Sequence, residues 1–226
     1  MVVEDKYFRW YKKLRKKTEV IFSPTGNYEL KIEYFKTGKN SWNYTKGTIV
    51  STRTKNKIAQ IKRNFSHFWY SWVNHSNGCE YLLCGEDYQG QTVVNLSKER
   101  TESYLPTEAE NGVGFCWVGA YPSPDSNVLA VEGCVWACPY EIRFYEFCTP
   151  DTLPYREIGR VDSLEKVEGW KNGLFILSRE IEIRKSDGVP YEMLSESEQD
   201  ELDNGLVESS YKIENVSIDV KKLIKC

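Results

Sequence analysis

The chain has 226 residues, of which 40% are hydrophobic and 14% are aromatic, and its formal net charge is −3. Disordered chains have few aromatic residues and a large net charge, so this composition predicts a globular protein with a sizeable core. No apolar run approaches the about 18 residues of a membrane helix, so we expect no membrane span. The first residues also lack the apolar centre of a signal peptide. We therefore expect an intracellular protein, cytoplasmic or nuclear and not secreted.

The charge is concentrated near the two ends of the chain. Residues 1–17 carry a net charge of +5, and residues 192–208 carry −7 with no basic residue. We therefore divide the chain into a basic N-terminal segment (1–17), for which a helix is one interpretation, and one domain (18–226). The opposite charges could pair within one chain or between the subunits of an oligomer.

The basic segment interleaves aromatic and basic residues, a pattern that can bind single-stranded nucleic acid by stacking and phosphate contacts. Simple packing of this segment on the domain is the interpretation that we rank first, and nucleic-acid binding is second. The candidate nucleic-acid contacts are Arg9, Lys12, Lys13, Arg15, Lys16 and Lys17.

Short turn signals recur along the domain, each after an aromatic segment and before an apolar run. They centre on Gly26, Gly78, Ser126 and Gly173, at spacings of 52, 48 and 47 residues. A period of about 40–50 residues with several short strands per unit is typical of β-propellers. We therefore predict four units, roughly 18–65, 66–113, 114–160 and 161–226.

Each unit divides into short strand-like runs separated by turn residues. In the first two units we expect strands at 18–23, 28–35, 45–52, 57–63, 67–73, 79–85, 91–96 and 100–105. In the last two we expect strands at 114–121, 127–133, 140–147, 154–159, 166–170, 174–179 and 180–185, and a further run at 211–220. The predicted fold class is all-β, a small propeller-like arrangement of about four antiparallel four-stranded units, which limits the exposed sheet edges.

The tract YPSPDSNVLAVEG (121–133) resembles the Ser-Pro-Asp-Gly-x-x-Leu-Ala-x-x-Gly turn and strand of WD40-like propeller blades, and FSPTGNYELKI (22–32) is a weaker match. No unit begins with Gly-His or ends with Trp-Asp, and Ser126 replaces the usual turn glycine, so the resemblance is to small propeller-like proteins and not to WD40 proper. It implies a scaffold that binds other macromolecules without a catalytic centre.

The connections between the second and third strands of the first three units are rich in aromatic and acidic residues. If the units are blades, these connections project from one face, opposite the repeated turns. Large rigid aromatic side chains beside a few charges suit a protein-binding surface. The candidate partner-binding residues are Trp42, Tyr44, Glu86, Asp87, Tyr88, Glu132, Trp136 and Tyr140. The alternative is that these aromatic side chains pack inward.

Thiols allow a second interpretation of the same face. Cys84, Cys134 and Cys138 could converge as metal ligands, although a buried cysteine is more often a small hydrophobic residue. The acids and thiols there could also serve a small hydrolase or lyase. His67 and His75 are the only histidines, and we expect both to satisfy backbone hydrogen bonds.

The leading hypothesis is a non-catalytic interaction or scaffold module with protein partners and no cofactor. It could also be a structural component of a larger assembly. A hydrolase, lyase or metal-binding protein is the first alternative, and a nucleic-acid-binding protein is the second.

Overall fold

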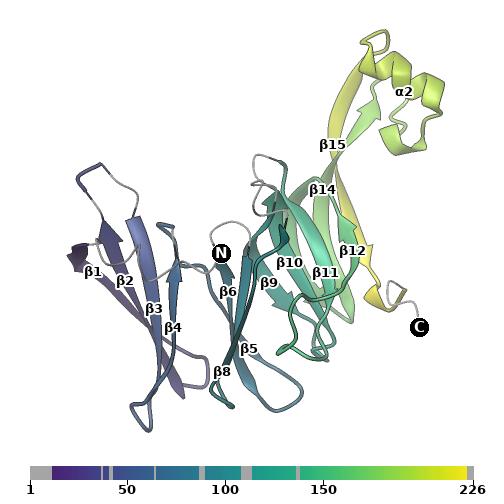
Figure 1. Cartoon of the computed structure of the whole chain (residues 1–226). Coiled ribbons are helices and arrows are strands. Elements are labelled where there is room, and N and C mark those ends of the chain that lie inside the picture. Colours follow the sequence, from purple (N-terminus) through teal and green to yellow (C-terminus); the bar gives the residue numbers. More distant parts are fainter. Residues whose placement is uncertain are drawn as a thin grey trace.

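A computed structural model describes residues 12–36, 38–40, 43–63, 65–86, 90–107, 114–135 and 138–222. These residues form four antiparallel sheets that follow one another along the chain (Figure 1). The first sheet has four strands: β1 (Lys12–Phe22), β2 (Tyr28–Lys36), β3 (Asn43–Ser51) and β4 (Lys57–Arg63). The second sheet also has four strands: β5 (Ser71–Asn74), β6 (Glu80–Glu86), β7 (Gly90–Asn95) and β8 (Arg100–Tyr104).

The third sheet repeats this pattern, with strands β9 (Phe115–Pro122), β10 (Val128–Val135), β11 (Glu141–Glu146) and β12 (Glu157–Val161). The fourth sheet has three strands: β13 (Leu164–Lys171), β14 (Leu174–Arg184) and β15 (Ser209–Ile218). In every sheet the strands are hydrogen-bonded in chain order. The prediction of an all-β, propeller-like arrangement of four antiparallel units is confirmed.

The four repeated turns occupy the same place in each sheet, between its first and second strands. Gly26, Gly78, Ser126 and Gly173 all have positive φ, between 60° and 82°. A residue in this left-handed region is needed to close these tight turns, which explains why glycine recurs there. Ser126 takes the same conformation at φ 60°. We call the end of the molecule that carries these turns the turn end.

Three apolar clusters join consecutive sheets face to face. Large buried side chains from these clusters include Leu30, Ile49, Phe68, Tyr81, Phe147, Phe144 and Phe175. The second sheet packs on both faces, since Val94 belongs to the cluster shared with the first sheet and Val93 to the cluster shared with the third. This is why the inner sheets contain unbroken apolar runs, whereas a half-solvated strand alternates.

The N-terminal basic segment differs from the helix that we considered. Lys12 and Lys13 pair with Lys36 and Phe35 of β2, so the backbone of 12–17 belongs to the edge strand β1. The register shifts between Lys13 and Thr18, which marks a bulge. Arg9 lies outside the described residues.

The fourth unit differs as well, because the two short strands expected at 174–179 and 180–185 are one strand of 11 residues. Alternation continues through Arg179 and Glu180 with no glycine, proline or asparagine to turn the chain. The acidic stretch that follows forms the short helix η2 (Tyr191–Met193) and the helix α2 (Glu196–Asp203), and η3 (Val220–Lys222) follows β15. The far halves of β14 and β15 and the helices between them project beyond the other sheets, and we call residues 179–214 the arm (Figure 1).

Within the described residues, no helix has the length and apolar character needed to cross a membrane.

Candidate functional site

The antiparallel order places three connections at the end of the molecule opposite the turn end. These are the β2–β3, β6–β7 and β10–β11 connections, and we call this end the hairpin end. The arm projects from the same end (Figure 1). Four of the predicted partner-binding residues, namely Trp42, Asp87, Tyr88 and Trp136, lie outside the described residues. Glu86 ends β6, and only its backbone is described.

The other three predicted partner-binding residues have different surroundings. Tyr44 is half-buried on β3, opposite Phe35. Glu132 lies within β10 and accepts a 2.7 Å hydrogen bond from the Tyr121 hydroxyl, so its carboxylate serves the packing of the third sheet. Tyr140 is 44% exposed and directly precedes β11. Of these three residues, Tyr140 is the one that the structure places in the open at the hairpin end.

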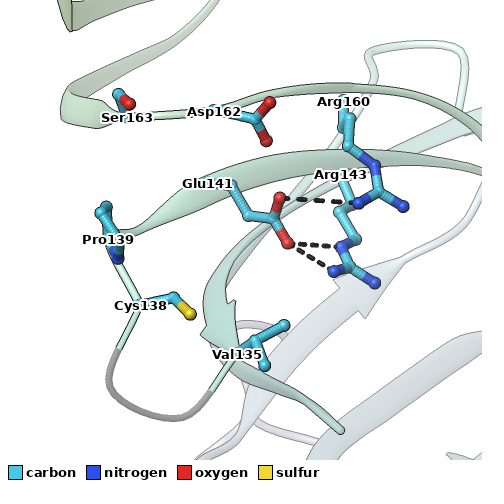
Figure 2. A pocket seen from close by; sticks show the side chains of 8 residues that line it. All are labelled: Val135, Cys138, Pro139, Glu141, Arg143, Arg160, Asp162 and Ser163. Atoms are coloured by element: carbon cyan, nitrogen blue, oxygen red, sulfur yellow. Dashed lines mark hydrogen bonds and ion pairs between the residues drawn. The ribbon is translucent and has the colours of Figure 1, made fainter. Parts of the chain in front are cut away.

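A cavity of about 290 Å³ lies beside the β10–β11 connection (Figure 2). Its lining residues come from β10, the β10–β11 connection, β11, β12 and the turn after β12: Val135, Cys138, Pro139, Glu141, Arg143, Arg160, Asp162 and Ser163. Leu164 at the start of β13 donates its backbone N–H to the carbonyl of Tyr140 at 2.7 Å. This bond ties the connection to the fourth sheet.

Charged groups of both signs meet in this cavity. The buried Glu141 carboxylate accepts hydrogen bonds from Arg143, with Nε at 2.7 Å and Nη2 at 2.5 Å. Arg160 lies 3.9 Å from the other oxygen of Glu141 and bonds to Glu157 at 2.8 Å. The Arg143 guanidinium also lies 4.0 Å from the centre of the Phe115 ring, which fixes its orientation.

Glu141 and Asp162 form a carboxyl pair at the mouth of this network. Burial raises the pKa of Glu141, and the hydrogen bond with Asp162 raises it further, while Arg143 and Arg160 act in the opposite direction. Both carboxyl groups line the cavity, so a cationic group that enters it would meet them.

The raised pKa of Glu141 predicts a specific pH dependence of stability. The folded chain holds a proton on Glu141 that the unfolded chain has already released, so the free energy of unfolding should fall as pH rises from the ordinary glutamate pKa through the raised one. Glu141→Gln should remove this falling limb in urea unfolding measured over about pH 4–7. Glu146→Gln on the same strand is the control, since the pKa of Glu146 is lowered by Arg156 and the falling limb should remain. An unchanged slope in the Glu141 variant would contradict the assignment.

A second cavity of about 220 Å³ lies on the other side of the Asp162–Ser163 turn, at the base of the arm. Arg179 projects from β14 and binds Glu214 at 2.9 Å and Glu192 at 2.8 Å. The two cavities share Asp162 and Ser163, so the turn that links the third and fourth sheets lines both. Ser163 has φ 55°, in the left-handed region that favours glycine. No glycine marks this turn in the sequence.

The three candidate metal ligands do not converge. Cys84 is buried in the cluster between the first and second sheets, whereas Cys134 and Cys138 belong to the third sheet. Cys134 instead faces Cys116 across β9 and β10, and burial raises the pKa of Cys116 to about 12. Burial also raises the pKa of Cys134, which disfavours a thiolate nucleophile there. Among the described residues, no group of three or more metal-ligating side chains is present.

The two histidines play different parts. His67 is exposed, whereas His75 is buried at the turn end of the second sheet. The Nε2 atom of His75 lies 3.0 Å from the carbonyl oxygen of Ser126 and 2.9 Å from that of Phe147, both in the third sheet. Its Nδ1 accepts the backbone N–H of Asn77 at 3.1 Å. Because Nδ1 accepts from Asn77, Nε2 is the atom that donates to the two carbonyl groups, and the ring joins two sheets.

Four sheets stacked in chain order through three apolar clusters define an all-β protein of propeller-like architecture.

No family model matches the chain. Over 137 residues it is 38% identical to the uncharacterized protein R762 of Acanthamoeba polyphaga mimivirus, an alignment that covers 59% of this chain and 53% of that protein. The chain thus spans about half the length of this relative. Among solved structures it is similar to the β-propeller domain of Cps50 (Swd1) from Myceliophteria thermophila, with a TM-score of 0.43 and 11% identity over 77% of this chain and 52% of that one.

Proposed function

We propose that this chain is a non-catalytic protein-interaction or scaffold module that binds its partner at the hairpin end. The observation that carries the proposal is the cavity beside the β10–β11 connection, which brings the buried Glu141 and the exposed Asp162 together beside the exposed Tyr140. Two observations in the third sheet favour binding over catalysis. The Glu132 carboxylate is bonded to Tyr121, and burial raises the pKa of Cys134, which disfavours a thiolate nucleophile. An aromatic side chain beside a polar cavity suits a protein interface.

The chemistry of the cavity suggests which group of the partner enters it. A lysine or arginine side chain of the partner would pair with the carboxylates of Glu141 and Asp162, which both line the cavity. The cavity of about 290 Å³ has room for such a side chain. The proposed surface extends from there over the other connections of the hairpin end, including the residues predicted from the sequence: Trp42, Tyr44, Glu86, Asp87, Tyr88 and Trp136.

Arrayed peptides provide a direct test, with random flanks and a central arginine, lysine, citrulline or norleucine. The intact protein should retain the peptides with a cationic centre and release the neutral ones. Asp162→Asn should weaken this binding by about tenfold or more, because the charge that attracts the cation is lost. Tyr140→Ala should weaken it as well.

Two matched controls separate this effect from a general loss of structure. Asp125→Asn makes the same change at the turn end, where Asp125 bonds to Ser123 and Asn127, and Tyr211→Ala removes an exposed tyrosine from the arm. Both controls should bind as the intact protein does. Equal retention of cationic and neutral peptides, or unchanged binding by Asp162→Asn, would refute the proposal.

A further inference from the structure

The stack of sheets has two open ends. The second and third sheets are covered on both faces, whereas the apolar clusters of the described residues cover only one face of the first sheet and one face of the fourth. These two sheets lie at opposite ends of the row (Figure 1). In a closed propeller the first sheet packs on the last sheet. Here these two sheets are apart, so each has one face without the neighbouring sheet that the inner sheets have.

The open face of the first sheet combines apolar side chains with charges of both signs. Register places Phe22 beside Glu29, and Val20 beside Lys31 and Thr48, on the face opposite Leu30. Phe22 is 56% exposed and Val20 is 50% exposed, although both lie on the edge strand β1. The exposed part of this face lies toward the turn end, since Glu33 and Phe35 farther along β2 are buried.

The open face of the fourth sheet combines apolar and acidic side chains. Register places Ile213 beside Glu180 and Tyr211 beside Glu182, on the face opposite Leu177 and its partner Val216. Tyr211 is 63% exposed and Ile213 is 53% exposed, and both lie on the edge strand β15. Each end of the stack thus shows two large apolar residues two positions apart on an edge strand.

The charge of the chain is distributed along the direction in which the sheets stack. Residues 12–63, which span the first sheet, contain fourteen lysines and arginines and three glutamates, a net charge of +11. Residues 164–218, which span the fourth sheet and the arm, contain thirteen acids and six bases, a net charge of −7. Residues 71–104 and 115–161 each carry −3. The near-neutral chain therefore has a positive end and a negative end, so identical ends repel and opposite ends attract.

We propose that a second copy of this chain docks head to tail, with the open face of its fourth sheet on the open face of the first sheet of its neighbour. The contact joins two different surfaces, so repetition either closes a ring or extends a row of copies, depending on the rotation between them. The exposed residues of the fourth sheet lie in the arm and those of the first sheet lie toward the turn end, so the two copies are offset along the direction of the strands. This assembly uses the ends of the stack and leaves the cavity at the hairpin end available.

Light scattering of the purified full chain, over a range of concentrations at low and high salt, tests the proposal. We expect species larger than one chain at low salt and their dissociation as salt rises. Lys31→Glu, and separately the pair Glu180→Lys and Glu182→Lys, should each weaken self-association by about tenfold or more, because each brings side chains of like charge together at the contact. Lys98→Glu, an exposed charge reversal in the turn between β7 and β8, is the matched control and should assemble as the intact chain does.

Mixing the two charge-reversed proteins is the decisive step. Copies of either variant repel one another. In a 1:1 mixture, however, the unchanged first sheet of one variant meets the unchanged fourth sheet of the other, and the two reversed faces also carry opposite charges. The mixture should therefore recover the assembly. A single chain at every concentration and salt, or association unaffected by the reversals, would overturn the proposal. So would a first sheet that binds a single-stranded oligonucleotide in a salt-dependent way while the protein itself stays monomeric. Tyr140→Ala should leave the assembly unchanged, so failure here and failure of the proposed partner site can be told apart.

Discussion

Replacing His75 with alanine is expected to lower the free energy of unfolding by about 3 kcal/mol, since it leaves two buried carbonyl groups without their donor and removes a packed ring. Those carbonyls belong to Ser126 and Phe147 in the third sheet. The ring also packs edge-on against Tyr81 and Phe147, with centroids 5.8 Å and 5.4 Å apart. The loss should therefore loosen the junction between the second and third sheets. Urea denaturation followed by tryptophan fluorescence measures it.

The chain supplies its own control for this substitution. His67 is the other histidine and is exposed, so His67→Ala should change the free energy of unfolding by no more than about 0.5 kcal/mol. His75→Gln keeps an N–H donor and should recover part of the loss. A loss below about 1 kcal/mol in His75→Ala would mean that the two carbonyl bonds contribute little.

Gly133→Ala is expected to destabilise the chain by about 3 kcal/mol or more, because the new methyl group meets backbone that cannot move aside. A Cβ atom on Gly133 would lie 2.1 Å from the carbonyl oxygen of Cys116 and 2.6 Å from the Phe115 ring. Gly133 pairs with Trp117 on one side and Glu141 on the other, next to a register shift that brings β9 close. Glycine is the residue that such a close approach of strands requires.

Gly38→Ala is the control for this prediction. The added methyl group would have no atom within 4 Å at that position, so its effect should stay within about 0.5 kcal/mol. Thermal unfolding by circular dichroism compares the two variants. A Gly133 variant as stable as the control would show that β9 can shift away from β10.

The repeated turns show how far the sequence alone could reach. A positive φ is a local demand that glycine satisfies, so the anchors at Gly26, Gly78 and Gly173 could be located without any tertiary information. The hairpin end followed from them, since antiparallel strands place alternate connections at opposite ends. A repeat period near 48 residues predicts four strands in the last unit, which is why two short strands were expected where β14 lies. The alternation of apolar and polar residues continues through Arg179, and the structure has one continuous strand there.

The candidate site was harder to predict. The cavity joins Glu141 and Arg143 on β11 with Arg160 on β12 and Asp162 in the next turn, and the register of these strands shifts between Phe144 and Tyr145. Such a shift depends on packing and leaves no local pattern. The interpretation of His75 was confirmed for its bond to Asn77, but its two bonds to the third sheet depend on how the sheets stack.

The sequence by itself determined the number of units, the places of their turns and the charge at each end of the chain. These are set by backbone conformation, side-chain alternation and composition, all of which act over a few residues. Only the tertiary structure decided which carboxyl groups line one cavity, which thiols face each other and which sheet faces stay open. Those relations join residues far apart in the chain, and they exist only after the sheets have stacked and buried their apolar faces.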